Sequence, residues 1–167
     1  MDVTHEIEKA AISFGPDSRN RLAETADPSA GGAEAALESF YYAFHHADTA
    51  ALRAVWSDSP LAQLDNPVGG ILRGADAIAG LYQKALASPA NVRVTFGDVV
   101  AYHGESHAVF AGRETGSYTT ADGKTTPLRI RTTRYFRYSD GHWRLYHHHG
   151  SIDDPDALRA YQHAIRG

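Results

Sequence analysis

The 167-residue chain contains no cysteine, which excludes disulfides, thiolate metal sites and cysteine nucleophiles together. The chain also lacks an excess of positive charge: its net charge is −4, and its Lys and Arg residues are scattered along the sequence. We therefore expect no nucleic-acid partner. No apolar run approaches the length of a membrane span, and the first residues lack the basic and then apolar pattern of a signal peptide. We therefore expect a cytoplasmic protein that contacts no membrane.

What the chain does contain is the composition of one globular domain, with 43% hydrophobic and 22% charged residues. Residues 14–32 are rich in Pro, Gly and small polar residues, whereas residues 1–12 have the composition of a possible short helix. We interpret residues 1–32 as a flexible leader and residues 33–167 as a single domain.

The domain begins with helical patterns. Apolar residues spaced at three and four positions predict a first helix, a second short helix after the capping residue Asp48, and a third helix; their apolar positions are Leu37, Phe40, Tyr41 and Phe44, then Leu52, Val55 and Trp56, then Ile78, Leu81, Tyr82, Ala85 and Leu86. Two short strands, or one strand and a loop, are predicted around the NPVGG turn. Asp154 and Pro155 predict the cap and first turn of a short closing helix.

The second half of the domain has a sequence pattern typical of a β-sheet. Four segments rich in Val, Thr, Tyr and Phe alternate with turn sequences, and they comprise residues 91–102, 107–119, 127–138 and 142–151. This order predicts an antiparallel meander. Helices followed by a long antiparallel sheet indicate an α+β domain with the helices packed on one face.

The last hairpin determines which side chains face the helices. Asp140 and Gly141 favour a two-residue turn, which sets the register of the two strands that it joins. That register places Arg134 opposite His147 and Thr132 opposite His149, on the face that also carries Phe136. His148 then points to the other face, so the three consecutive histidines do not act together.

A charged arginine on the covered face needs a partner, because burying it alone is costly. The partner is either an anionic group of a ligand or a buried carboxylate, for which Glu114 is the obvious candidate. A two-residue turn at Asp122 and Gly123 would bring Arg113 to this face instead, whereas a three-residue turn with a bulge would bring Glu114.

The run TRYFRYSDGHWRLYHHHGS, residues 133–151, resembles a known family. It has T-R, then a turn ending in D-G, a tryptophan, and H-x-H before a serine, as in the association domain of calcium/calmodulin-dependent protein kinase II. LYQKAL and the glycines before it add to the resemblance, which covers residues 34–155. The family is the nuclear-transport-factor-2-like superfamily, which also includes ketosteroid isomerase and the SnoaL polyketide cyclases.

This resemblance implies a cone-like α+β fold. Three N-terminal helices would pack on a strongly curved, mainly antiparallel mixed sheet and enclose a pocket, and the subunits would pair through the sheet as a homodimer. Arg134 matches one of the basic residues that line the pocket of the kinase's association domain. Glu114 stands where a second arginine of that pocket would fall, which favours a pair between Arg134 and Glu114.

These observations predict a pocket for a small, mostly apolar molecule with a polar or anionic group. Its predicted contacts are Arg134, Glu114, His149, Tyr82, Trp56 and Phe136. Two functions remain open: an isomerase, cyclase or dehydratase without a cofactor, in which His147 or Asp65 moves a proton, and a non-catalytic ligand-binding or oligomerisation domain. His147 and His149 are equally compatible with a structural role in the core. Asp65 or Glu114 could complete a metal site with them, but no second metal-spaced motif is present, so we predict none.

Overall fold

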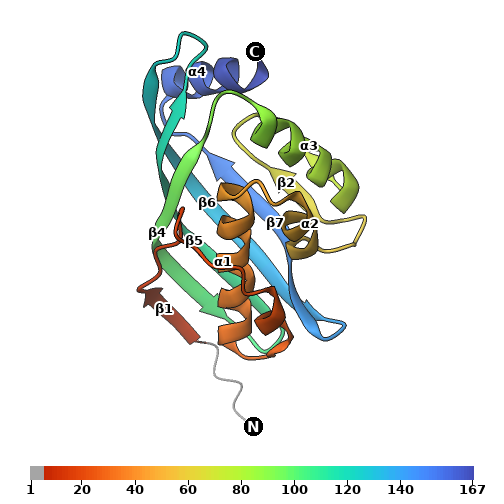
Figure 1. Cartoon of the computed structure of the whole chain (residues 1–167). Coiled ribbons are helices and arrows are strands. Elements are labelled where there is room, and N and C mark those ends of the chain that lie inside the picture. The colour runs from red at the N-terminus through yellow and green to blue at the C-terminus, as the bar shows by residue number, and fades with distance from the viewer. Residues whose placement is uncertain (1–5) are drawn as a thin grey trace.

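The computed structural model describes residues 6–167, and the elements follow the predicted order of helices before long strands (Figure 1). Their bounds are β1 Glu6–Ala10, the 3-10 helix η1 Leu22–Ala26, α1 Ala30–His45, α2 Thr49–Val55, β2 Gln63–Asp65, β3 Leu72–Arg73, α3 Ala75–Ala87, β4 Arg93–His103, β5 His107–Thr119, β6 Thr125–Ser139, β7 His142–Ser151 and α4 Pro155–Arg166.

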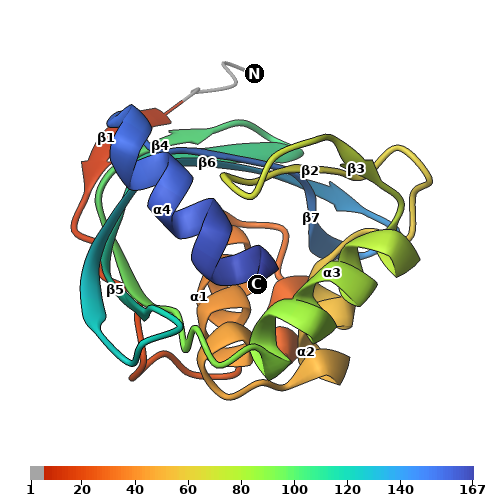
Figure 2. The same cartoon turned by 90° about the horizontal axis from the view of Figure 1, so that it is seen from above.

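The strands form one seven-stranded sheet in the order β1-β4-β5-β6-β7-β2-β3. All neighbouring strands are antiparallel except β2 and β7, which are parallel. The sheet bends around the helices, which lie on its concave side, with α4 crossing over one end (Figure 2). The predicted α+β class and the four-stranded meander are confirmed, and the sheet is mixed because of the β2–β7 pair.

The predicted apolar stripes explain why the helices pack on the sheet. Leu37, Phe40 and Tyr41 of α1 are all buried in the core. The caps also occur as predicted, since the side chains of Asp48 and Asp154 accept hydrogen bonds from the backbone N–H groups of Ala51 and Ala157. Within residues 6–167, no helix combines the length and apolar character needed to cross a membrane.

The short helix predicted for residues 1–12 is not found in the part of this segment that the structure describes. Residues 6–10 form strand β1, which pairs antiparallel with β4, and not part of a helix. The following segment is also attached to the domain, because Arg19 and Arg21 both pair with the carboxylate of Glu38 on α1. These contacts are between residues distant in sequence, which local composition does not reveal. Residues 1–5, the start of the predicted helix, lie outside the described residues.

The hairpin between β6 and β7 begins in the predicted register and then leaves it. Tyr138 opposes Trp143 and Phe136 opposes Leu145, as expected from the two-residue turn. A β-bulge then leaves Tyr146 unpaired, so that His147 opposes Tyr135. The prediction that His147 opposes Arg134 and that His149 opposes Thr132 was therefore wrong.

The bulge reverses the orientation of the three histidines. Beyond it, His148 opposes Arg134 and is buried, while Gly150 opposes Thr132. His147 and His149 point to the outer face of the sheet. Because successive side chains alternate, one extra residue moves every following side chain to the opposite face.

The turn between β5 and β6 decides between Glu114 and Arg113. The N–H of Thr120 donates to the carbonyl of Lys124, and Gly123 has a φ of +82°. These features describe a three-residue turn with a glycine bulge, which was the alternative that favours Glu114. Glu114 accordingly faces the helices together with Arg134.

Candidate functional site

An ion pair between Arg134 and Glu114 lies buried between the sheet and α1. The Nη2 atom of Arg134 lies 3.0 Å from Oε1 of Glu114, and their side chains are only 2% and 7% exposed. Tyr41 donates to the same carboxylate oxygen at 2.6 Å, and Thr132 donates to the other oxygen at 3.1 Å. The arginine is thus satisfied by a carboxylate of the chain itself, the second of the two expected solutions.

The guanidinium group of Arg134 is held on its other sides by aromatic rings. Its central carbon lies 3.7 Å from the centre of the Phe40 ring, a cation–π contact in a desolvated setting. Its Nε atom donates to the hydroxyl of Tyr41 at 3.3 Å. Its Nη1 atom, however, is buried and has no hydrogen-bond partner. Both N–H donors of this nitrogen therefore remain available.

His148 lies opposite Arg134 on the neighbouring strand β7. It is buried, and its Nδ1 atom also lacks a partner. Burial lowers the pKa of His148 well below its ordinary value, and the positive charge of Arg134 acts in the same direction. The imidazole is therefore neutral near pH 7 and has one ring nitrogen free to donate or accept a hydrogen bond.

Two adjacent cavities lead from this ion pair to the surface. The inner cavity, of about 60 Å³, is bounded by Glu114, Arg134 and His148. The outer cavity, of about 490 Å³, lies between α1, α3, α4 and the start of β4. Both are lined by the same residues where they meet, namely Phe44, Asn66, Tyr82, Val92 and Tyr161.

The outer cavity combines an apolar wall with positive charge. Its apolar lining residues include Leu81, Leu86, Val68 and Ile165. The charged residues that line it are Lys84, Arg93 and Arg166, all of them cations. Among residues 6–167, no carboxylate lies within ion-pair distance of these three groups.

The structure separates the residues predicted for the pocket into three groups. Arg134, Glu114 and Tyr82 line the cavities, and burial raises the pKa of Tyr82 to about 12. Trp56 and Phe136 are buried in the core and do not contribute to the lining of either cavity.

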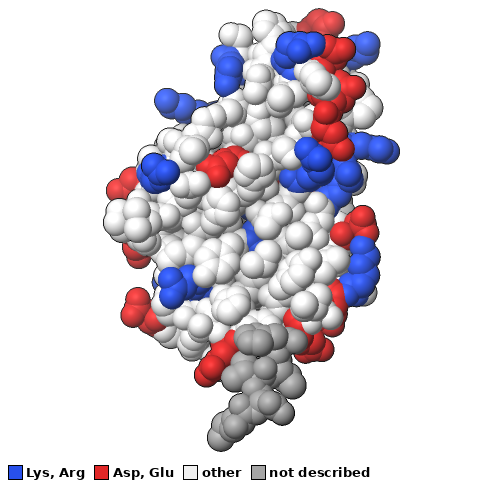
Figure 3. Space-filling view, turned by 180° about the vertical axis from the view of Figure 1, so that it is seen from behind, with Lys and Arg blue, Asp and Glu red and all other residues white. Residues whose placement is uncertain are grey.

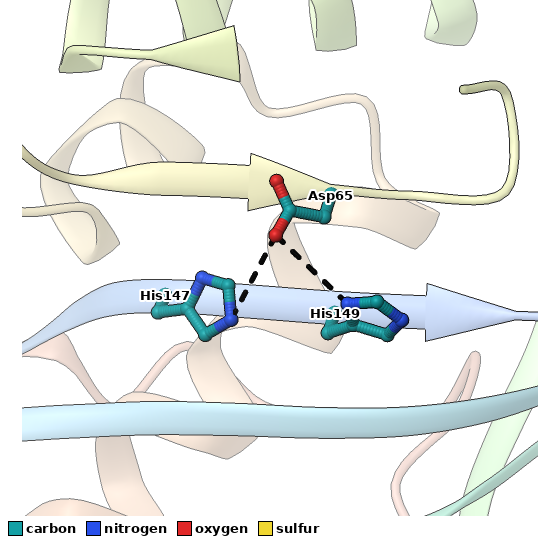
Figure 4. Close-up of side chains that lie close together, drawn as sticks. All are labelled: Asp65, His147 and His149. Carbon is teal, nitrogen blue, oxygen red and sulfur yellow. Dashed lines mark ion pairs between the residues drawn. The ribbon is translucent and has the colours of Figure 1, made fainter. Parts of the chain in front are cut away.

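The third group, Asp65, His147 and His149, lies together on the outer face of the sheet (Figure 4). The predicted acid–base residues His147 and Asp65 are therefore close to each other but not to Arg134. The predicted contact His149 is likewise separated from the cavities by the sheet. None of these three residues lines either cavity, so the roles predicted for them in the pocket have no support in the structure.

Sequence reasoning missed several residues that form the site. His148 was assigned to the wrong face because the bulge at Tyr146 has no local sequence signature. Tyr41 was recognised only as an apolar position, although its hydroxyl bonds to Glu114. Tyr161 belongs to the apolar stripe of the closing helix, and that stripe could have indicated a cavity wall.

Three solved structures show how this fold recurs. A ketosteroid isomerase-like protein from Erwinia carotovora atroseptica is 22% identical, with 82% of this chain and 99% of that chain covered and a TM-score of 0.63. A candidate calcium/calmodulin-dependent protein kinase type II association domain from Thiobacillus denitrificans is 24% identical, with 72% and 94% covered and a TM-score of 0.61. A candidate dehydratase from Streptomyces avermitilis is 20% identical, with 70% and 90% covered and a TM-score of 0.60.

At these identities the likeness establishes the fold alone, which is that of the nuclear-transport-factor-2-like proteins. The chain belongs to the SnoaL-like domain family, which matches residues 33–155. No curated protein matches the sequence. The family resemblance carried by residues 133–151 is thereby confirmed, while the chemistry of the site must be argued from its own residues.

The buried ion pair makes a testable contribution to stability. Arg134→Met leaves Glu114 charged and unpaired, and Glu114→Leu leaves the guanidinium unpaired, so we expect each to lower the free energy of unfolding by about 3–5 kcal/mol. The double variant removes both charges, and its loss should be well below the sum of the single losses.

Urea unfolding of the four proteins measures this coupling, with Arg113→Met as the control. Arg113 is the neighbour of Glu114 in sequence but faces outward and is partly exposed, so its replacement should change stability by less than about 0.5 kcal/mol. Strictly additive losses for Arg134→Met and Glu114→Leu would show that the two groups do not depend on each other.

Proposed function

We propose that the protein binds a small, mostly apolar molecule with an anionic group in the cavity between α1, α3 and α4. One observation carries this proposal: the wall of this outer cavity is largely apolar, and every charged residue that lines it is a cation. Its volume of about 490 Å³ falls within the usual range for small-molecule sites.

The position of the charges suggests how such a ligand lies. Lys84, Arg93 and Arg166 line the outer cavity and have no carboxylate partner, so they favour an anionic group there. The apolar body of the ligand would lie against Leu81, Tyr82 and the residues of α4. A carbonyl or hydroxyl at the far end would reach Nη1 of Arg134 and Nδ1 of His148, whose desolvation is otherwise uncompensated.

A second, catalytic function is supported by the presence of Arg134 and His148 in the lining of the same inner cavity. A neutral imidazole beside a fixed cationic donor is suited to moving a proton next to a carbonyl, because the donor stabilises the negative charge that develops on oxygen. In this reading the acid–base residue is His148, in place of the predicted His147. The reaction would be an isomerisation, cyclisation or dehydration that needs no cofactor.

We further propose that two copies pair through the outer face of the sheet. Figure 3 shows this face, whose middle is largely uncharged while most charged side chains lie towards its margins. The registers of β4, β5 and β6 place six uncharged residues together here, and we call them the outer patch: Val100, Tyr102, Val109, Ala111, Thr133 and Tyr135. Tyr102 is among the few large hydrophobic residues that are exposed.

Two matched dyes test the ligand proposal. 1-Anilinonaphthalene-8-sulfonate is apolar with one anionic group, and N-phenyl-1-naphthylamine is the same ring system without it. We expect the sulfonate to bind more tightly, and Lys84→Ala/Arg93→Ala to weaken its binding about five- to tenfold with little effect on the neutral dye.

Fluorescence titration gives both affinities, and Arg129→Ala, which removes an exposed cation outside the two cavities, serves as the control. Equal affinity for the two dyes, or a loss with Arg129→Ala as large as that with the double variant, would contradict an anion-selective cavity.

Deuterium exchange tests the catalytic function. A panel of cyclic ketones that carry a carboxylate is incubated in D₂O, and NMR follows the hydrogens next to the carbonyl. We expect wild type to accelerate exchange for at least one bound compound and His148→Gln to lose this acceleration by at least tenfold.

The pH dependence identifies the base. A base with an ordinary histidine pKa would be partly protonated at pH 6, whereas the lowered pKa of His148 keeps it neutral, so the rate should be nearly constant between pH 7.5 and 6. Exchange that is absent for every bound compound would exclude the catalytic function and leave the binding proposal intact.

Sedimentation velocity tests the dimer. Tyr102→Glu introduces a charge at an exposed position of the outer patch and should raise the dissociation constant of the dimer at least tenfold. Gln83→Glu introduces the same charge on the exposed side of α3 and should leave the dimer unchanged. A monomeric wild-type protein would overturn this proposal.

A further inference from the structure

A cluster of possible metal ligands lies on the outer face of the sheet, away from both cavities. It comprises Asp65 on β2 and His147 and His149 on the adjacent strand β7 (Figure 4). We propose that these three side chains form a site for one divalent transition-metal ion, with Zn²⁺ as the best fit. Two imidazole nitrogens and one carboxylate oxygen are ligands that Zn²⁺ takes in proteins.

The three ligand atoms are already close to metal-binding geometry. Oδ2 of Asp65 lies 4.0 Å from Nε2 of His147 and 3.9 Å from Nδ1 of His149. All three atoms lie within 4.8 Å of one another. A point equidistant from three atoms so spaced is about 2.3–2.5 Å from each, only a few tenths of an ångström longer than the usual bonds to zinc. Small side-chain rotations therefore suffice to close the site.

Hydrogen bonds from neighbouring groups orient two of the ligands. Nδ1 of His147 lies 3.1 Å from the carbonyl oxygen of Gln63, to which it donates when the ring is neutral. This bond assigns the proton to Nδ1 and leaves the lone pair of Nε2 directed towards Asp65. Metal-binding histidines characteristically donate their other N–H group to a carbonyl or carboxylate in this way.

The carboxylate of Asp65 is held by two successive hydrogen bonds between side chains. The amide of Gln63 donates to Oδ2 of Asp65 at 3.0 Å, and Nε of Arg73 donates to the amide oxygen of Gln63 at 2.9 Å. The second oxygen of Asp65 is buried without a partner, so its desolvation is not compensated by the chain alone. A metal ion beside the carboxylate would supply the missing positive charge.

In the single chain the site is accessible and retains an open side, next to Thr133 and Tyr135 of the outer patch. The side chain of Asp65 is 18% exposed, whereas that of His149 is 58% exposed. Three protein ligands with a solvent-facing side leave a fourth position for water. Because the ligands lie on two hydrogen-bonded parallel strands, they cannot separate without breaking the sheet. The proposal is independent of the ligand-binding function, since the sheet separates the two sites.

Titration with Zn²⁺ alone tests this site. Protein freed of metal with a chelator is titrated with Zn²⁺ by calorimetry. Competition with a chromophoric chelator, followed by absorbance, gives the affinity independently. We expect one ion per chain and at least tenfold weaker binding for each of His149→Ala and Asp65→Asn. Zn²⁺ should also raise the melting temperature of wild type, because it binds the folded state, and should raise that of the variants much less.

His163→Ala is the matched control, because it removes an exposed histidine from α4. It should leave the affinity for Zn²⁺ unchanged. Since His149 is largely exposed, its replacement should not impair folding, and circular dichroism verifies this. Equal affinity of wild type and His149→Ala, or a ratio of one ion to two chains, would overturn the proposed site.

Discussion

The burial of one positive charge organises this domain. Arg134 lies at the centre of the concave face, where desolvation would be prohibitive without Glu114 on the neighbouring strand. Glu114 in turn accepts hydrogen bonds from Tyr41 of α1 and from Thr132, so the pair ties the first helix to the middle of the sheet. The guanidinium donates to Tyr41 and Glu114 of the chain itself, and its buried Nη1 group, at the edge of the inner cavity that Arg134 lines, is left without a partner. Any ligand that reaches this depth meets a cation that is already neutralised and held in place.

A single extra residue gives the three consecutive histidines two different environments. The bulge at Tyr146 directs His148 inward, beside Arg134, and places His147 and His149 on the outer face beside Asp65. Without it, the two outer histidines would enter the core and His148 would be exposed. Strand alternation alone thus separates a dry, neutral imidazole from a solvent-facing pair within three positions.

Much of the fold follows from the sequence, because amphipathic periodicity reports burial directly. The helices around Leu37 and Ile78, the four long strands and the turn at Asp140 all form as expected, and the glycine bulge at Gly123 was one of the two alternatives that the sequence left open. The predictions that were wrong concern features that depend on contacts between residues distant in sequence. Strand β1 forms against the edge that β4 offers, and the bulge at Tyr146 is a property of the pairing between β6 and β7. Periodicity also cannot tell a cavity wall from a closed layer, which is why Trp56 and Phe136 were assigned to the pocket.

The two ends of the sheet limit how the protein can associate with others. One edge is formed by β1, which is five residues long and carries Glu6, Glu8 and Lys9, and the other by β3, which has two residues. Short and charged edge strands offer few unpaired backbone groups to an approaching strand, so extension of the sheet from chain to chain is disfavoured. Contacts with another molecule are consequently directed to the broad faces of the domain, where side chains and not backbone hydrogen bonds determine the partner.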